Sequence, residues 1–504
     1  MQSPTPTAST SSSPSASSTG GRHRIIVVGT GFSGLCMGVK LREQGEENFV
    51  ILERADQVGG TWRDNTYPGC ACDVESHLYS FSFEPNPEWS RLYAPQPEIF
   101  AYLRKVAVKY DLMRHIRFKT NLVGARWDDA RRLWVVTSDD GRVFEGEVLV
   151  SGMGGLSNPA FPSIPGLEQF AGPQFHSATW RHDVDLSDQR VAVIGSGASA
   201  IQFVPQIAPK VAHLSYFQRT PPWVVPKMDR PVTERERADF QANPWRQRIA
   251  RNKLYWALEA RFLAFKYKPE WMNLVAKVGK HRIRKHIKDP ALQAKLTPSY
   301  TPGCKRLLIS NDYYPALART NVEVVTEGIR EVRAHSVVTQ DGREHPVDVI
   351  IFGTGFKVQD PIPQGAIFGK GGVDLWAQWR AGPEAFMGIT VTGFPNFFML
   401  MGPNTGLGHN SMVYMIESQA HYIIEALKAM KEHRLRSIEV KPEAQARFVS
   451  TVQKALTGTV WNSGCKSWYL NEQGRNTAAW PGFTFAYRLK TRRFSLQPYR
   501  TERT

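Results

Sequence analysis

Two copies of one strand–turn–helix pattern constrain the fold of this chain more than any other feature. In the first copy, the apolar run Ile25–Val28 leads into a glycine-rich turn, and a helical pattern follows over Phe32–Gln44. Its glycines are spaced GxGxxG, at Gly29, Gly31 and Gly34. The first glycine permits the tight turn, the second lets a phosphate approach the backbone, and the third lets the helix pack on the strand.

The acidic residue after the second strand extends this pattern. The run Phe49–Leu52 ends in Glu53, nineteen residues after Gly34. A carboxylate at this point accepts hydrogen bonds from ribose hydroxyls and repels a 2′-phosphate. Strand, glycines, helix, strand and acid together predict a dinucleotide site, whereas the glycines alone would be weak evidence.

The second copy differs from the first where the acid would stand. The strand Val191–Ile194 leads into a GxGxxA turn, made by Gly195, Gly197 and Ala200. The next strand, His213–Phe217, is followed by Arg219, nineteen residues after Ala200. An arginine at that offset attracts a 2′-phosphate, which predicts a preference for NADP(H) over NAD(H). A surface arginine at a strand end is the alternative.

The first site repels a 2′-phosphate and the second attracts one. We therefore predict FAD in the first site and NADPH in the second. Two further pieces fit this plan. Asp348–Phe356 is an apolar strand closing on a glycine turn, which we expect to return the chain to the FAD domain. The run Phe397–Met401, followed by GPNTGLGHNS, predicts another turn beside the flavin.

Composition sets the class of protein. The 504 residues are 42% apolar and 22% charged, as in ordinary globular proteins, and no run of about eighteen apolar residues predicts a membrane span. Residues 1–21 are rich in Ser, Thr and Pro and have no apolar core segment, so we expect a disordered tail and no secretory signal. The five scattered cysteines predict no disulfide framework and favour a reducing cytoplasm.

The formal charge of +17 is concentrated in one segment. Residues 246–295 hold fourteen Lys and Arg against three acids, with aromatic residues interleaved. Such a segment keeps a nucleic-acid or anionic-membrane partner open as an interpretation. A solvated helical face is the simpler interpretation, and no nucleic-acid module accompanies the charge. We therefore expect no nucleic-acid or membrane partner.

Two longer motifs carry a family resemblance. FAGPQFHSATW matches the pattern FxGxxxHxxxW at Phe170, Gly172, His176 and Trp180, and the chain thereby resembles the class I Baeyer–Villiger monooxygenases. GGTWRDNTYPGCACD, from Gly59 to Asp73, matches the second motif of that family. Related N- and S-oxygenating flavin monooxygenases usually carry another aromatic residue where Trp180 stands. Arg181 departs from the Pro or Asp of the family pattern, which affects the contacts of the linker.

The resemblance implies a catalytic pair. Arg306 looks like the catalytic arginine, oriented by Asp73, while Lys305 looks like a contact of the 2′-phosphate and Trp468 like a cover over bound NADP+. In this family, oxygen adds to reduced flavin as a peroxide whose anion attacks a carbonyl carbon. A permanently charged guanidinium favours that anion, and a carboxylate fixes the guanidinium in place. Without the resemblance, a plain surface ion pair and a packing tryptophan would be equally good interpretations.

The expected architecture is an α/β fold with two Rossmann-like, doubly wound nucleotide-binding domains. The FAD domain is expected over 22–152 and 355–504, the NADP domain over 157–221 and 306–350, and a helical insertion over 222–305. His176 is expected to be a linker residue rather than an acid–base catalyst, and no metal site is expected. The cofactor contacts expected are Gly29, Gly31, Phe32, Ser33, Gly34, Glu53, Arg54, Gly60, Thr61, Trp62, Asp73, Gly195, Gly197, Ala198, Ser199, Ala200, Arg219, Thr220, Lys305 and Trp468.

The resemblance therefore implies an enzyme that uses FAD, NADPH and O2 to convert a small-molecule ketone into an ester or lactone, as a monomer or weak homo-oligomer. One alternative is an N- or S-oxygenating flavin monooxygenase, against which Trp180, Asp73 and the Lys305-Arg306 pair count. Another is a non-oxygenating flavin oxidoreductase, which would need a CxxC motif that the sequence lacks. A third is a protein that binds nucleic acid or acidic membranes through its basic segment.

Overall fold

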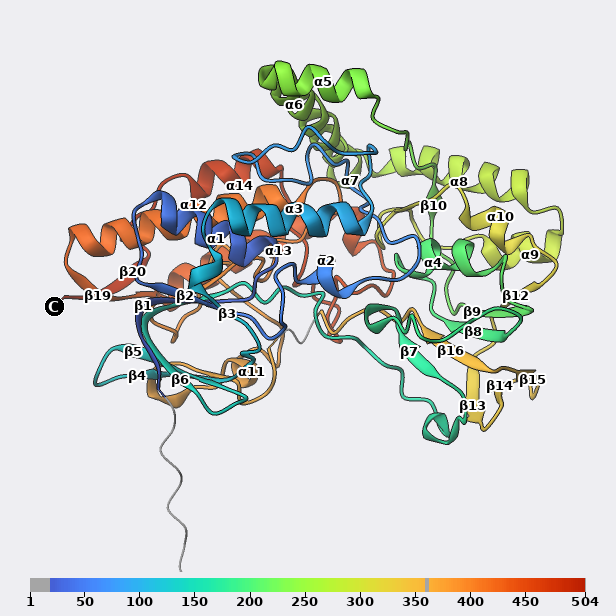
Figure 1. Cartoon of the computed structure of the whole chain (residues 1–504), viewed down its shortest axis with the longest axis horizontal. Coiled ribbons are helices and arrows are strands. Elements are labelled where there is room, and N and C mark those ends of the chain that lie inside the picture. Colours follow the sequence, from blue (N-terminus) through green and yellow to red (C-terminus); the bar gives the residue numbers. More distant parts are fainter. Residues whose placement is uncertain (1–18, 359–361, 504) are drawn as a thin grey trace, which may run out of the picture.

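The computed structural model describes residues 19–358 and 362–503 (Figure 1). The predicted α/β fold is confirmed: two separate sheets, each with helices beside it, divide most of the chain. The predicted disordered tail is wrong for residues 19–21, which open strand β1 (Thr19–Val28). Backbone pairing of Thr19 and Gly21 with Val143 and Phe144 accounts for the longer strand. Residues 1–18 lie outside the described part of the chain.

The first sheet has eight strands, in the order β17-β4-β5-β6-β1-β2-β3 with β18 beside β6. Its other strands are β2 (Phe49–Leu52), β3 (Ile116–Arg117), β4 (Leu122–Asp128), β5 (Leu133–Ser138), β6 (Val143–Ser151), β17 (Ile367–Phe368) and β18 (Phe397–Met399). The central strand β1 pairs in parallel with β2 and β6. Ile25, Ile26 and Val27 are fully buried, as expected for a parallel strand covered on both faces.

The second sheet has five strands in the order β12-β9-β8-β16-β7, all parallel to their neighbours. They are β7 (Gln174–His176), β8 (Arg190–Ile194), β9 (His213–Phe217), β12 (Val322–Val325) and β16 (Val349–Phe352). The apolar run that begins at Asp348 thus joins this sheet as β16, and the chain leaves it through the turn at Gly353. Three antiparallel strands lie nearby: β13 (Ile329–Arg333), β14 (Ser336–Thr339) and β15 (Glu344–Pro346).

Helices cover both sheets. Those of the first sheet are α1 (Phe32–Glu43), α2 (Thr61–Asp64), α3 (Gln96–Lys109), α11 (Leu375–Gln378), α12 (Met412–Glu432), α13 (Pro442–Leu456) and α14 (Thr484–Thr491), and those of the second are α4 (Ala200–Ile207) and α10 (Tyr313–Leu317). Helix α1 packs on α12, and α12 packs on α14. The antiparallel strands β19 (Leu435–Val440) and β20 (Tyr499–Arg503) complete the C-terminal part.

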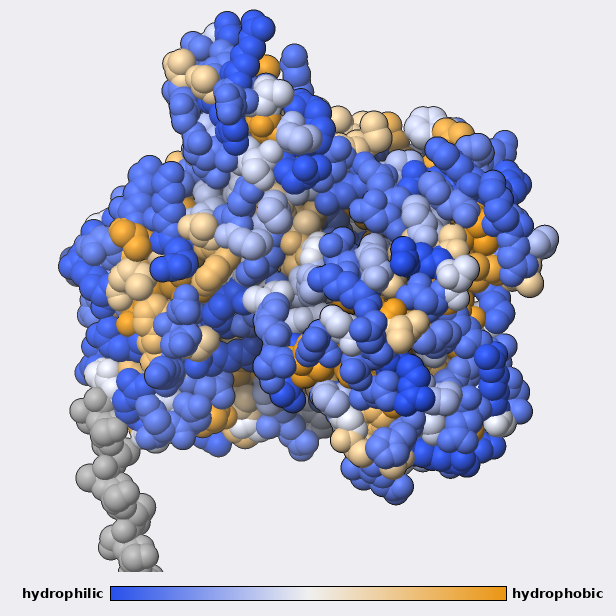
Figure 2. All heavy atoms as spheres, turned by 45° about the vertical axis from the view of Figure 1, so that its right-hand side comes forward, coloured by the Kyte–Doolittle hydropathy of each residue, from blue (hydrophilic) through white to orange (hydrophobic). Residues whose placement is uncertain are grey.

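The segment predicted as an insertion is helical. Its helices are α5 (Glu234–Ala242), α6 (Pro244–Ala260), α7 (Phe262–Lys266), α8 (Met272–His286) and α9 (Pro290–Leu296), and the parallel strands β10 (Val224–Val225) and β11 (Leu308–Ile309) flank them. Helices α5 and α6 project above the rest of the molecule, with a mostly hydrophilic surface (Figures 1 and 2). Buried Glu259 of α6 accepts hydrogen bonds from Asn410 (2.5 Å) and from the Thr484 hydroxyl (2.7 Å), so the insertion is attached to the C-terminal part.

The cysteine prediction needs a correction. Cys304 and Cys465 form a disulfide, although 161 residues separate them. Sequence spacing cannot reveal such a pair, because the fold of the insertion brings its end against the C-terminal segment. Cys36, Cys70 and Cys72 are buried free thiols. Within the described ranges, no helix is long and apolar enough to span a bilayer.

Candidate active site

Both glycine turns line one cavity of about 1400 Å³. Eighteen of the twenty predicted cofactor contacts line it; the two that do not are Gly34 and Ala200. Arg306 also lines the cavity. The strands therefore place at one site the residues that the sequence had divided between two patterns.

The first turn has no room for side chains at two of its glycines. Gly29 has φ +95°, and a Cβ there would lie 2.8 Å from the Gly152 carbonyl oxygen. A Cβ at Gly34 would lie 1.8 Å from the carbonyl oxygen of Gly29, which is impossible without moving backbone. Gly34 does not line the cavity. Its missing side chain lets α1 pack closely against the end of β1.

The N-terminus of α1 suits a diphosphate. Its N-cap is Gly31, no side chain caps it, and its first turn holds no acidic residue. The first backbone N–H groups of a helix have no partner within it, and the helix dipole favours an anion there. The free backbone N–H groups of this terminus fit the diphosphate of FAD. Gly31 and Gly60 carry no side chain that would keep a diphosphate away from the backbone.

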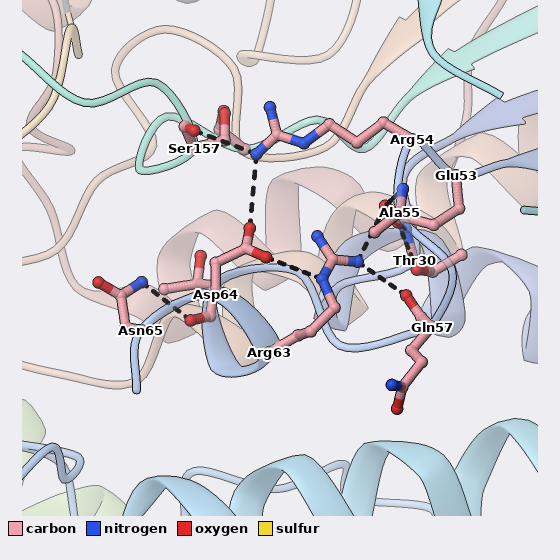
Figure 3. Close-up of polar contacts among 11 residues, drawn as sticks. Thr30, Glu53, Arg54, Ala55, Gln57, Arg63, Asp64, Asn65 and Ser157 are labelled. Atoms are coloured by element: carbon pink, nitrogen blue, oxygen red, sulfur yellow. Dashed lines mark hydrogen bonds and ion pairs between the residues drawn. The ribbon is translucent and has the colours of Figure 1, made fainter. Parts of the chain in front are cut away.

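Glu53 is buried, and the chain itself already satisfies it (Figure 3). One carboxylate oxygen accepts from the Thr30 amide (3.0 Å) and hydroxyl (2.5 Å), and the other from the Ala55 amide (2.9 Å) and the Arg63 guanidinium (2.9 Å). A carboxylate offers about four acceptor positions, so these contacts fill them. The ribose contact expected of Glu53 needs one of them to be exchanged, and it stays a prediction.

Arg63 is the partner of Glu53 that sequence reasoning missed. Burial acts to lower its pKa, but hydrogen bonds and charges of Asp64 and Glu53 outweigh that effect, so the pKa is raised. Arg54 continues the network to the Asp64 carboxylate (3.4 Å) and the Ser157 carbonyl (3.1 Å) (Figure 3). The position of Arg63, directly after the predicted contact Trp62, was the only signal for it.

The second turn repeats the geometry with one change. Gly195 has φ +111°, and a Cβ there would lie 2.4 Å from the Gly353 carbonyl oxygen. Ala200 replaces the third glycine, and its methyl group is accommodated because Gly353 faces it; a Cβ at Gly353 would lie 3.2 Å away. The N-cap of α4 is Ser199, again without a side-chain cap.

Two cations lie together at this second turn. Arg219 is exposed and Lys305 is half-buried, and both line the cavity. Burial, and then the charge of Arg219, lowers the pKa of Lys305, whose ammonium lies 5.0 Å from the ring centroid of Tyr300. Within residues 19–358 and 362–503, neither cation forms an ion pair with a carboxylate. Unneutralised positive charge at this place suits a phosphate group.

Arg306 has the partner that the family resemblance implies. Its Nε and Nη2 atoms donate to Oδ2 of Asp73 at 2.8 and 2.7 Å, and its Nη1 donates to the Leu407 carbonyl at 3.3 Å. The Asp73 charge raises the pKa of Arg306 above its ordinary value. These hydrogen bonds fix the guanidinium in place. The side chain is still 31% exposed, so the group also faces the cavity.

Trp468 and Tyr469 are neighbours in the chain with different surroundings. Trp468 is 41% exposed and lines the cavity, with its ring centroid 4.1 Å from that of Tyr469. Tyr469 is fully buried, which raises the pKa of its phenol, while the Arg306 charge acts to lower it. Sequence reasoning missed Tyr469, although it directly follows Trp468.

The fingerprint motif does not line the cavity. Phe170 packs in a core with Ile194 and Phe352, and a Cβ at Gly172 would lie 2.1 Å from the Asp348 carbonyl oxygen. His176 is fully buried, which lowers its pKa, and its Nδ1 accepts from the Ala178 amide (3.1 Å).

Trp180, the last residue of the fingerprint, packs against Phe175 and Phe203 with ring centroids 5.2 and 5.3 Å apart. The exposed Arg181 forms an ion pair with Asp183. The motif therefore packs within the second sheet and its helix α4, and its residues do not face the cavity.

Thiol and metal chemistry find little support at this site. Cys70 and Cys72 line the cavity, but burial raises the pKa of Cys70 to about 11 and that of Cys72 well above its usual value, which favours the protonated thiol over the nucleophilic thiolate. Neither cysteine of the disulfide lines the cavity. Among the described residues, no group of three or more His, Cys, Asp or Glu could hold a metal ion.

Comparison with known proteins gives consistent matches. The family model Flavin-binding monooxygenase-like matches residues 22–370. A Baeyer-Villiger monooxygenase of Pseudomonas aeruginosa is 54% identical over 481 residues, covering 95% of this chain and 91% of that protein. One of Streptomyces coelicolor is 48% identical over 483 residues, covering 95% and 93%. The structure of cyclohexanone monooxygenase from Rhodococcus sp. Phi1 bound to NADP+ is similar, with a TM-score of 0.87 at 31% identity, covering 97% of this chain and all of that one.

Proposed function

Since this chain belongs to the Flavin-binding monooxygenase-like family, we propose that it is an NADPH-dependent Baeyer–Villiger monooxygenase that inserts one oxygen atom of O2 beside a ketone carbonyl. The observation that carries the proposal is the Arg306–Asp73 ion pair in the cavity shared by both glycine turns. The product would be an ester or a lactone.

The two nucleotides are assigned to the two turns. The uncapped N-terminus of α1 and the bare backbone at Gly31 and Gly60 would hold FAD, which when bound supplies the activation of O2 and the oxygen transfer. The N-terminus of α4 would bind the NADPH diphosphate, and Arg219 and Lys305 its 2′-phosphate. Trp468 would cover the bound nucleotide.

Arg306 is proposed as the catalytic residue. Its guanidinium keeps its charge at every working pH, so it stabilises the negative charge that develops on oxygen as the carbonyl carbon is attacked. Asp73 keeps it in one orientation through two bonds to a single oxygen, which avoids reorganisation during the reaction.

Location and assembly are inferred from chemistry. Three of the five cysteines are buried free thiols, and the enzyme proposed here needs a supply of NADPH, which together favour the cytoplasm. We propose a monomer or weak homo-oligomer, with the basic insertion as a solvated face rather than a nucleic-acid surface. Constant mobility in gel filtration at low and high salt, with and without DNA, would support this assignment.

The main rival function is oxygenation of nitrogen or sulfur. A purified sample given NADPH, air and a probe carrying both a ketone and a thioether separates the two by mass spectrometry. Ester formation supports the proposal, and sulfoxide alone contradicts it. Non-oxygenating flavin chemistry would oxidise NADPH without adding oxygen to the probe.

Arg306→Ala tests the role of the guanidinium. We expect the variant to bind flavin and oxidise NADPH while ester formation falls by about a hundredfold or more, the loss typical of removing an oxyanion-stabilising group. Arg306→Lys, which keeps a charge but loses the paired geometry, should retain part of the activity. Arg330→Ala, at an exposed position of β13, is the matched control. Ester formation by Arg306→Ala at the wild-type rate would refute the assignment.

A further inference from the structure

The disulfide joins two segments that both reach the cavity. Cys304 directly precedes Lys305 and Arg306, and Cys465 lies three residues before Trp468. The cysteines themselves lie outside the cavity lining, while Lys305, Arg306 and Trp468 belong to it. The covalent bond therefore connects the segment of the proposed phosphate and catalytic contacts with the segment of the proposed nucleotide cover.

The segment that carries Trp468 is otherwise weakly buried. Residues 462–464 and Lys466 are exposed, as is Trp468 itself, whereas Tyr469 returns to the core. The Cys465 amide also points at the sulfur of Cys304, at 3.3 Å. This segment makes local contacts at its two ends, Ser463 to the Val460 carbonyl and the ring of Trp468 on Tyr469, and the covalent tether adds a long-range constraint on its order.

The two sulfurs differ in accessibility. Cys304 is fully buried, and Cys465 is partly exposed, so an external thiol reaches the bond from the Cys465 side. Attack there forms a mixed disulfide between Cys465 and the external thiol and releases Cys304. A second external thiol then attacks the mixed disulfide, which releases Cys465 and leaves the two external thiols joined as a disulfide. In the opposite direction, hydrogen peroxide oxidises the two thiols: they lose two protons and two electrons, one S–S bond forms, and the peroxide becomes two waters.

We propose that Cys304 and Cys465 form a reversible redox modification site that controls how tightly the chain binds NADP+. In the oxidised state the tether joins the segment of Trp468 to the segment of Lys305, and in the reduced state the segment 462–468 is released. The inference rests on the proposed function only in taking NADP+ as the nucleotide of the second turn.

The first measurement is chemical. Peroxide-treated and dithiothreitol-treated proteins are alkylated, digested and weighed by mass spectrometry. We expect the peptides of Cys304 and Cys465 to be linked in the oxidised sample and both alkylated in the reduced one. Trypsin should also cut after the exposed Lys466 faster in the reduced protein. Alkylation of both cysteines after peroxide treatment would overturn the proposal.

The second measurement is NADP+ affinity by calorimetry on the flavin-loaded protein. We expect a Kd about tenfold higher in the reduced state, the scale on which loss of preorganisation acts. The variant with Cys304→Ser and Cys465→Ser should show the weaker Kd under both conditions. Cys36→Ala, which removes a buried thiol of α1, should keep the full redox response. An equal Kd in oxidised and reduced wild type refutes the proposal.

These readouts separate the two hypotheses, because neither requires ketone oxidation. A redox-dependent Kd supports the inference even if the probe gives no ester, in which case the proposed function alone fails. Ester formation combined with a redox-independent Kd leaves the function standing and overturns the inference.

Discussion

At the scale of single residues, the cavity holds two kinds of cation. Arg306 is neutralised by Asp73 and held by the Leu407 carbonyl, whereas Arg219 and Lys305 have no carboxylate within the described chain. A paired cation is fixed in orientation, which suits catalysis. Two cations without a carboxylate partner are strongly stabilised by a bound phosphate, which suits a binding role.

Arg219→Ala should therefore act on the choice of nucleotide. We expect the KM for NADPH to rise about tenfold or more, since a charge-assisted hydrogen bond contributes ~1.5–3 kcal/mol, while the KM for NADH stays nearly constant. Steady-state kinetics with both nucleotides measure the effect. Arg181→Ala removes an exposed arginine paired with Asp183 and serves as the control. A parallel loss for NADH would mean that Arg219 does not recognise the 2′-phosphate.

Several residues of the site could be predicted from sequence, and others could not. Lys305, Arg306 and Asp73 lie in motifs whose family resemblance pointed to them. Arg63 and Tyr469 emerged only from the coordinates, because their importance depends on burial beside Glu53 and Arg306. Sequence reports which side chains are present, but burial decides which charges they must satisfy.

At the scale of elements, the glycine turns were predictable in detail. The expected strands beside the two turns and the helix after the first turn match their predicted bounds within one residue, except that β1 begins six residues before Ile25. Apolar runs and glycine spacing are local signals. The membership of β16 in the second sheet could not be predicted, because it depends on pairing with β8 and β7. Non-local pairing leaves little trace in a single sequence.

Gly34→Ala tests the packing of α1 on β1. The added Cβ would lie 1.8 Å from the Gly29 carbonyl oxygen, so the helix must move away from the strand. We expect a destabilisation of about 3 kcal/mol or more and loss of bound flavin, measured by thermal unfolding and by absorbance. Gly124→Ala in β4, where a Cβ has nothing within 4 Å, should leave both unchanged. Full flavin content in Gly34→Ala would show that the turn tolerates a side chain.

At the scale of the whole molecule, buried polar groups attach the insertion to the rest of the chain. Glu259 of α6 accepts from Asn410 and Thr484, and Gln247 of α6 contacts the His77 ring at 3.2 Å. His409 lies between these parts, 4% exposed, with its ring centroid 5.1 Å from that of Phe262. Among the described residues neither of its ring nitrogens forms a hydrogen bond, and the nearest carboxylate oxygen, of Glu259, is 3.9 Å from Nε2. None of this could be read from the basic composition of the insertion.

The stability of the whole molecule should therefore fall in mild acid. Burial, with a smaller effect of the Arg261 charge, lowers the pKa of His409 to about 3, and burial lowers that of His77 to about 4. In the unfolded chain both titrate near pH 6.5, so below that pH the unfolded state takes up protons that the folded state refuses. The free energy of unfolding should fall as the pH drops from about 6.5, until the folded-state pKa values are reached.

For His409 the loss between about pH 7.5 and pH 5 should be about 2 kcal/mol, from the difference in proton binding of the two states. Urea unfolding at both pH values measures it. His409→Gln cannot titrate, so its stability should depend less on pH by that amount, even though it is less stable at neutral pH. His281→Gln, at an exposed position of α8, should keep the wild-type dependence. If His409→Gln lost as much stability in acid as wild type, the acid sensitivity would have to come from groups other than this buried ring.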